Sequence, residues 1–284
     1  MPPESPLVIP AQAVQPLEFK RIQSLTYQMA GIDLRDGKEA LVGARLNKRI
    51  RELGLKDVSS YLSVVEADRT GLELAALIDA LTTNFTSFLR EPQHFEFLRS
   101  VILPEMADGA SLRIWSAGCA TGEEPYSILF HLVQALGERR VGEVEILASD
   151  ISTRALTAAE AGVYPAARMR ELPEEWRKRF FQRGVGTQEG MVRVRREWRS
   201  RIRFQRINLM EDLASLPRFH VIFCRNVMIY FNKATQQKLV RRFATQLESG
   251  GWLLIGHSEG LMGMEHELSY VMPATYRKPM NRRG

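Results

Sequence analysis

The apolar residues in the first third of the chain recur with helical spacing. One stripe, with steps of three and four residues, consists of Val42, Leu46, Ile50 and Leu53. Gly54 follows the stripe and is a typical helix stop. No strand-like alternation interrupts this part of the chain, so the pattern predicts a helical N-terminal domain over residues 17–90. Residues 1–16 are rich in proline and aperiodic, and we expect a loose leader there.

The pattern changes after a linker helix and loop expected at residues 91–109. Short apolar runs then alternate with helical stretches. The predicted strands are residues 112–118, 144–150, 202–208, 220–224 and 252–256, and the predicted helices between them are 124–136, 153–161 and 233–248. Strands that alternate with helices indicate an α/β domain with a doubly wound, mostly parallel sheet, here over residues 110–284.

Residues 164–201 break the alternation and predict an inserted β-subdomain. Met191–Arg195 alternates apolar with basic residues, as a short exposed strand does, and Gly184-Val185-Gly186 indicates a turn. The charge also gathers here. The chain has 39 Lys and Arg against 33 Asp and Glu, a net charge of +6, but residues 166–206 alone hold 13 against 5. This local excess fits either a docking surface for an acidic partner or a solvated basic face.

The composition excludes several classes of protein. A hydrophobic fraction of 45% argues against disorder, and two cysteines, Cys119 and Cys224, are too few for a disulfide scaffold. We expect both to be small buried fillers. The N-terminus has no signal-peptide pattern, and no apolar run reaches the length of about 18 residues that spans a bilayer. We therefore expect a cytoplasmic protein.

The candidate binding residues stand where predicted parallel strands end, since ligands bind beyond the carboxyl ends of such strands. The turn Ser116–Glu124 follows the first strand but lacks the dinucleotide pattern G-x-G-x-x-G, and its two glutamates would repel a pyrophosphate. Asp150 ends the second strand and either binds ribose hydroxyls or caps a helix. Asn208 ends the third strand and either contacts an adenine or caps a turn. Together they indicate an adenosine-containing ligand, either a nicotinamide cofactor or S-adenosylmethionine (SAM).

Two further segments carry polar side chains towards the same edge. Arg225 and Asn226 follow the fourth strand, with Tyr230 four residues beyond, although Tyr230 also fits a core aromatic. The polar stretch 82–91 joins the helical domain to the α/β domain and could close over a pocket. His257-Ser258-Glu259 and His266-Glu267 lack the helical spacing of a zinc pair, so we expect no metal site.

These motifs together resemble the chemotaxis receptor methyltransferase family, CheR type. The resemblance covers roughly residues 17–280, and its most specific strings are Thr-Gly-Glu-Glu-Pro-Tyr-Ser from Thr121 and Cys-Arg-Asn-Val-Met-Ile-Tyr-Phe from Cys224. It implies a class I SAM methyltransferase fold with a helical N-terminal domain and a β-subdomain. The implied cofactor contacts are Asn84, Thr86, Arg90, Glu124, Asp150, Asn208, Leu209, Arg225 and Asn226, and Arg90 and Tyr230 match positions that line the methyl-transfer site.

The resemblance also implies the reaction and its partners. Glutamate side chains in the cytoplasmic helical region of chemoreceptors would become methyl esters, with S-adenosylhomocysteine as the product. The basic helix residues Arg45, Lys48 and Arg49 could dock that acidic region, and the loop with Gly184 and Gly186 resembles one that binds a receptor's C-terminal pentapeptide. We expect a monomer, recruited to receptor arrays without membrane insertion, that binds no nucleic acid. The alternatives are a nucleic-acid methyltransferase and a non-catalytic module that senses SAM.

Overall fold

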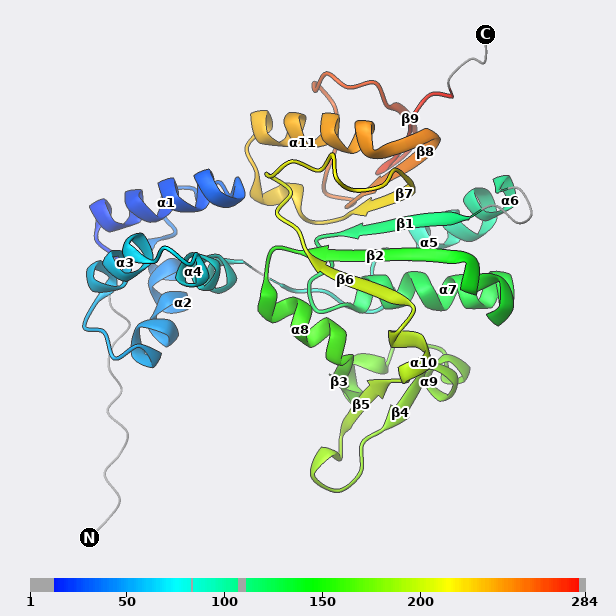
Figure 1. Cartoon of the computed structure of the whole chain (residues 1–284), viewed down its shortest axis with the longest axis horizontal. Coiled ribbons are helices and arrows are strands. Elements are labelled where there is room, and N and C mark those ends of the chain that lie inside the picture. Colours follow the sequence, from blue (N-terminus) through cyan, green and yellow to red (C-terminus); the bar gives the residue numbers. More distant parts are fainter. Residues whose placement is uncertain (1–12, 83, 107–110, 281–284) are drawn as a thin grey trace. The chain divides into compact units, whose positions relative to one another are not determined.

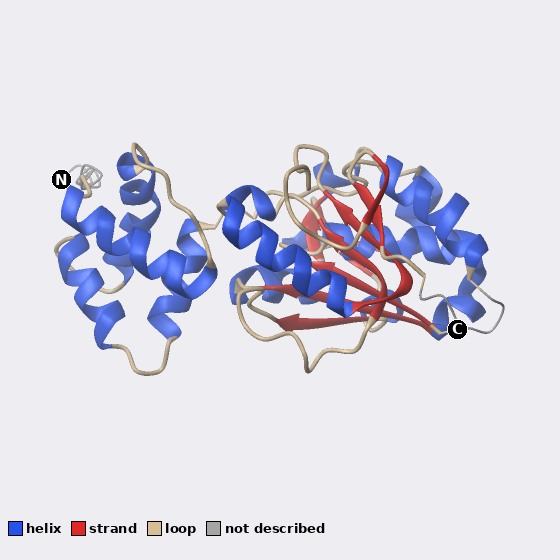
Figure 2. Ribbon diagram, turned by 90° about the horizontal axis from the view of Figure 1, so that it is seen from above, coloured by secondary structure: helices blue, strands red, loops and turns tan. Residues whose placement is uncertain are grey.

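A computed structural model of the chain describes residues 13–82, 84–106 and 111–280 (Figure 1). The chain divides into two compact units, residues 1–82 and 83–284. In the described residues, strands are found only in the second unit (Figure 2). The expected leader, residues 1–16, lies mostly outside the described residues. No helix of the described segments has the length and apolar character needed to cross a membrane.

The first unit consists of helices, as the apolar spacing predicts. They are α1 (Pro16–Ala30), α2 (Glu39–Glu52), α3 (Val58–Ala67) and α4 (Leu72–Leu81). The α2 stripe is buried at Val42, Leu46 and Ile50, which pack in one core with residues of the other three helices. Leu53 lies beyond the last turn of α2 and is exposed. Gly54 follows it with a φ of 66°, a left-handed conformation that glycine adopts without strain and that ends the helix.

The second unit is built on a mostly parallel sheet, which confirms the predicted α/β fold. Among the described residues seven strands lie in the order β6-β2-β1-β7-β8-β10-β9. The parallel strands are β1 (Leu112–Ala117), β2 (Val144–Asp150), β6 (Ile202–Arg206), β7 (Phe219–Cys224) and β8 (Leu247–Ile255). From β1 the chain proceeds to β2 on one side and later places β7 on the other. This reversal is the topological switch point at which α/β sheets bind ligands.

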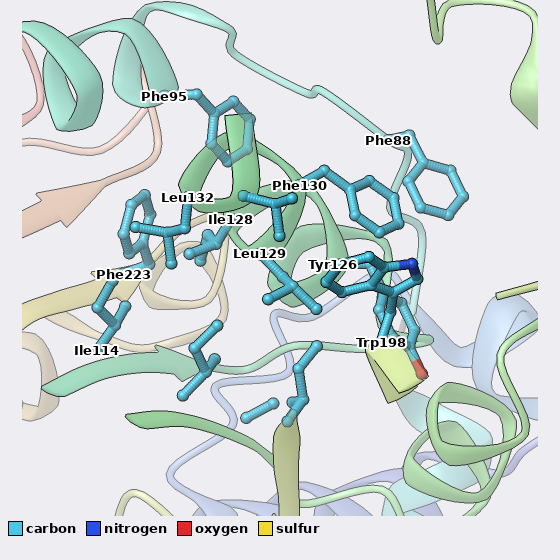
Figure 3. Packing of buried hydrophobic residues seen from close by; sticks show 14 of the residues in the cluster. Phe88, Phe95, Ile114, Tyr126, Ile128, Leu129, Phe130, Leu132, Trp198 and Phe223 are labelled. Carbon is cyan, nitrogen blue, oxygen red and sulfur yellow. The ribbon is translucent and has the colours of Figure 1, made fainter. Parts of the chain in front are cut away.

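Helices cover both faces of this sheet because its central strands are apolar on both sides. In β1, Ile114 packs in the large core with α7 (Glu123–Arg140), as Figure 3 shows. The next residue, Trp115, points to the opposite face, where its ring lies 5.5 Å from that of Phe243 in α11 (Lys233–Gln246). Alternate strand residues thus bury against different helices, as a doubly wound sheet requires.

The inserted β-subdomain is present as predicted. It is a three-stranded antiparallel sheet in the order β3-β5-β4, which follows α8 (Thr153–Ala161) in the chain. Its strands are β3 (Val163–Pro165), β4 (Phe181–Arg183) and β5 (Met191–Val194), accompanied by α9 (Glu174–Phe180) and α10 (Arg196–Arg199) and by the 3₁₀ turns η3 (Ala166–Met169) and η4 (Gly186–Gln188).

The remaining elements include two strands that the apolar pattern does not predict. These are β9 (Ser269–Met272) and β10 (Thr275–Arg277), antiparallel strands at the edge of the main sheet. Both are short, and β9 is mostly exposed, so neither has a clear periodicity. The linker forms α5 (Gln93–Phe97), a π-helical turn η1 (Leu98–Ile102) and α6 (Leu103–Glu105), and further 3₁₀ turns are η2 (Val141–Glu143) and η5 (Met228–Tyr230).

Candidate functional site

The turn after β1 is closed by its own main-chain hydrogen bonds. The N–H groups of Gly118 and Cys119 both donate to the Ser149 carbonyl at 2.8 Å, and that of Gly122 donates to the Cys119 carbonyl at 3.0 Å. A phosphate-binding loop instead points such N–H groups at its ligand. The turn therefore suits a ligand without phosphate, which favours SAM over a dinucleotide.

Asp150 holds this turn at the end of β2. Its carboxylate accepts hydrogen bonds from the N–H groups of Ala120 and Ser152, both at 2.9 Å, and the residue is 8% exposed. The helix-cap alternative for Asp150 is wrong, because Ser152 is the N-cap of α8 and accepts from the Ala155 N–H at 3.0 Å. A buried carboxylate at a strand end is the group that binds ribose hydroxyls in this class of sheet, so the site fits the adenosine part of SAM.

Asn208 caps a turn, which is one of its two predicted roles. Its Oδ1 accepts from the Met210 N–H at 3.0 Å, and its Nδ2 donates to Glu211 at 3.2 Å. It stands two residues beyond the end of β6, and the neighbouring Leu209 is buried. The adenine contact of Asn208 and Leu209 stays a prediction.

Glu124 lies at the start of α7 and faces the end of β7. Its Oε1 accepts from the Ser116 hydroxyl at 2.7 Å, and its Oε2 lies 3.2 Å from Nη1 of Arg225. Burial raises the pKa of Glu124 above its ordinary value, an effect that the Arg225 charge and the Ser116 hydroxyl only partly oppose. The carboxylate is thus fixed by two elements at the switch point.

Arg225 is the centre of a buried ionic cluster. Its side chain is 2% exposed, and its Nε lies 3.3 Å from Oε2 of Glu91. Its Nη2 donates to the Arg90 carbonyl, and its guanidinium lies 5.4 Å from the Phe95 ring centre. The guanidinium is thus bonded to protein groups on several sides. This geometry supports a role for Arg225 in holding α7 and the segment with Arg90 and Glu91 against the sheet.

Asn226 is held by two carboxylates, Glu259 and Glu91, that are not among the predicted site residues. It has a left-handed φ of 58°, its N–H donates to Glu259 at 3.0 Å, and its Nδ2 donates to Glu91 at 3.4 Å. Glu259 also accepts from the N–H groups of Gly256 at 2.6 Å and Ile229 at 3.1 Å. The carboxylate therefore joins the loops after β7 and β8. In the sequence Glu259 stands within His257-Ser258-Glu259, which lacks the spacing of a zinc pair, and no predicted role in the site falls on it.

The described part of the polar stretch, residues 84–91, lies along the carboxyl ends of the strands. Asn84 donates to the Ser152 hydroxyl at 3.3 Å, and the Thr86 carbonyl accepts from Arg168 at 3.3 Å. Arg90 bonds the Phe85 carbonyl at 3.2 Å through Nη1. Tyr230 ends η5 and is half-buried. The structure thus brings the polar stretch 84–91, the turn after β1 and the loop after β7 to one edge of the second unit.

The expected docking residues differ in how much charge they present. Lys48 has a side chain that is 82% exposed, with Glu52 3.8 Å away. Arg49 is partly buried and pairs with Glu73, and Arg45 bonds the Leu81 carbonyl. Within the first unit, Lys48 is therefore the freest of the three cations. In the second unit, Gly184 and Gly186 lie in the loop between β4 and β5, with Val185 between them 83% exposed.

Comparison with known proteins gives matches over nearly the whole chain. Residues 84–277 match a family model described as "CheR methyltransferase, SAM binding domain", and residues 17–82 match "CheR methyltransferase, all-alpha domain". The chain is 43% identical over 258 residues to the chemotaxis protein methyltransferase of Salmonella typhimurium, covering 90% of this chain and 88% of the relative. It is 41% identical to that of Escherichia coli, covering 90% and 89%, and 41% identical to chemotaxis protein methyltransferase 2 of Pseudomonas aeruginosa, covering 91% and 92%.

Proposed function

Since the chain belongs to the CheR methyltransferase family and carries its SAM-binding domain, we propose that it methylates glutamate side chains of bacterial chemoreceptors. Its relatives are chemotaxis protein methyltransferases. The observation that carries the proposal is the carboxyl edge of the sheet, where a turn unsuited to phosphate meets the buried Asp150 carboxylate. The alternative of a nucleic-acid methyltransferase is not favoured by any of these findings.

Methylation of a carboxylate does not require the protein to remove a proton from the acceptor. A glutamate side chain has a reference pKa of about 4.3, so it is already an ionised nucleophile at neutral pH. When bound, SAM supplies an activated methyl group on a sulfonium. The chain's own residues then have to align the acceptor and exclude water, and such alignment can lower a barrier by about 7–11 kcal/mol.

Arg90 and Tyr230 are the side chains that we assign to this alignment. Charge disappears as the carboxylate becomes an ester, so a tight ion pair to the acceptor would stabilise the ground state more than the transition state. We therefore assign Arg90 to orienting the cofactor or guiding the acceptor, and Tyr230 to shaping the pocket. Neither acts as a general base. The Arg90 carbonyl is held by Arg225, which supports a fixed position of this residue at the edge.

Receptor docking uses two separate surfaces in this proposal. Lys48 offers an exposed charge to the acidic helices of the receptor. The β4–β5 loop offers exposed main chain next to a short antiparallel sheet, which suits strand addition by a receptor's C-terminal peptide. The protein would then work in the cytoplasm at receptor arrays.

The test is methyl transfer from radiolabelled SAM to membranes that contain chemoreceptors, compared with transfer to RNA and DNA. We expect base-labile label on receptor protein only, and much less of it with Arg90→Ala. Label on nucleic acid would establish the first alternative. SAM binding without transfer to any acceptor would establish a sensing module. Full turnover by Arg90→Ala would contradict the role given to that residue.

A further inference from the structure

Three side chains of metal-ligating type meet beside the carboxyl edge of the sheet. Glu91 lies in the linker, His94 in α5 and His257 in the loop after β8, so the cluster joins two segments of the second unit that are far apart in the sequence. Each offers one ligand atom, and these atoms all lie within 4.8 Å of one another. This is the one group of at least three His, Cys, Asp or Glu side chains with such spacing in the described residues.

His94 provides an independent indication of a ligand. Its side chain is 1% exposed, and among the described residues neither ring nitrogen has a hydrogen-bond partner. Nδ1 lies 3.6 Å from Oε2 of Glu91, which is too long for a hydrogen bond. The ring packs edge-on against that of His257, with centres 5.0 Å apart. A buried polar ring without partners is costly, and metal ligation would satisfy it.

Hydrogen bonds and an ion pair hold the Glu91 carboxylate in place, as is common for a metal ligand. Its Oε1 accepts from the His257 N–H at 3.3 Å and from Asn226 Nδ2 at 3.4 Å, while its Oε2 lies 3.3 Å from Nε of Arg225. Carboxylates that bind metals are commonly oriented by such second hydrogen bonds. Glu124 also pairs with Arg225, so Glu91 shares this guanidinium with a second carboxylate.

We propose that Glu91, His94 and His257 bind one divalent transition-metal ion of the zinc type. Two imidazoles and a carboxylate are ligands for zinc, whereas magnesium and calcium require oxygen ligands throughout. His257 is exposed, so the remaining coordination position opens to solvent. The ion ties the linker to the loop after β8. The proposal departs from the expectation of no metal site, which rested on spacing along the sequence and could not bring His94 to His257.

The test is calorimetric titration of the full chain with zinc chloride after treatment with a chelator and its removal. We expect one binding site, together with a rise in the unfolding temperature, because an ion that binds only the folded state stabilises it. His257→Ala should weaken binding at least about tenfold, which corresponds to ~1.4 kcal/mol. His257 is exposed, so this variant should fold normally.

Two further variants make the result specific. His94→Leu fills the same space, and because the ring nitrogens make no hydrogen bonds, it should fold but lose zinc binding. His266→Ala, outside the cluster, is the matched control and should bind zinc as the unaltered chain does. Absence of stoichiometric binding by the unaltered chain, or equal binding by His257→Ala, would overturn the proposal. Equally tight binding of magnesium chloride would also overturn it, because the ligand chemistry would then be wrong.

Discussion

Nη1 of Arg225 lies 3.2 Å from Oε2 of Glu124, and this ion pair joins the end of β7 to the start of α7 across 101 residues of sequence. The same guanidinium reaches Glu91 in the linker. Three segments that carry expected cofactor contacts are thus held by one buried side chain. The organisation of the edge therefore depends on Arg225 even if that side chain never contacts the cofactor.

Replacement of Arg225 tests this dependence. Arg225→Ala leaves two carboxylates near each other without their cation, and breaking a buried pair in this way typically costs about 3–5 kcal/mol in the free energy of unfolding. Denaturant unfolding would measure it. Arg241→Ala is the control, because Arg241 pairs with Glu265 on the surface, and such pairs contribute at most about 1 kcal/mol. Equal losses for the two variants would contradict the role of Arg225.

Replacement of Glu259 should lower the rate of methyl transfer, although Glu259 is not among the expected cofactor contacts. Glu259→Gln replaces a carboxylate that accepts three main-chain N–H groups with an amide that has one acceptor oxygen. The β7 loop with Asn226 and Tyr230 should then shift, and displacements of this kind can cost about 100-fold in rate. Steady-state kinetics with receptor membranes would measure kcat/KM. Glu267→Gln, at an exposed site, should leave kcat/KM unchanged, and an unchanged value for Glu259→Gln would show that the loops hold without the carboxylate.

Lys48 should contribute to receptor binding through charge alone. Lys48→Glu reverses an exposed charge, so we expect KM for the receptor to rise several-fold at low salt while kcat stays the same. The effect should fade as salt rises, because attraction is screened beyond about 10 Å at 0.1 M. Lys20→Glu, an exposed lysine on α1, is the matched control. A KM that does not respond to salt in the unaltered protein would refute electrostatic docking.

The raised pKa of Glu124 predicts a pH effect on stability. Because burial makes the folded state hold this proton more tightly than the unfolded state does, the contribution of Glu124 to stability is full below the unfolded pKa of about 4.3. It is lost as pH rises through the folded-state pKa. The free energy of unfolding of the unaltered chain, relative to Glu124→Gln, should therefore increase as pH falls through the folded-state pKa of Glu124 towards the unfolded value of about 4.3.

Unfolding in urea at several pH values would measure the difference between the two proteins. Glu145→Gln, at an exposed position of β2, should show no such trend. A difference that stays constant with pH, or that moves in the opposite direction, would show that Glu124 is not held as the structure indicates.

The sequence predicted most accurately those elements whose ends are determined by neighbouring capping residues. The α8 helix begins and ends at the predicted residues, because Ser152 caps its start and Gly162 adopts a left-handed conformation at its end. The strands β9 and β10 were not predicted, because three or four residues are too short to show a periodicity: β9 is mostly exposed and β10 is mostly buried, so neither alternates. β10 pairs with β8 and β9 pairs with β10, and no local pattern contains these partners.

The sequence predicts those residues of the site that lie directly after a parallel strand. Asp150 and Asn226 follow from that rule and from the family resemblance. The hydrogen bonds of Glu91 do not, because Arg225 and His257 are 134 and 166 residues away in the sequence. Spacing along the sequence likewise cannot predict that His94 and His257 lie together, because they are far apart in the chain.

The most direct measurement of the central claim is mass spectrometry of a purified chemoreceptor fragment after incubation with the protein and SAM. We expect the mass of one methylene group on specific glutamates, removed by mild base, and absent where those glutamates are replaced with glutamine. Base-stable methyl groups, or methyl groups on other residue types, would contradict the proposal that this protein forms glutamate methyl esters.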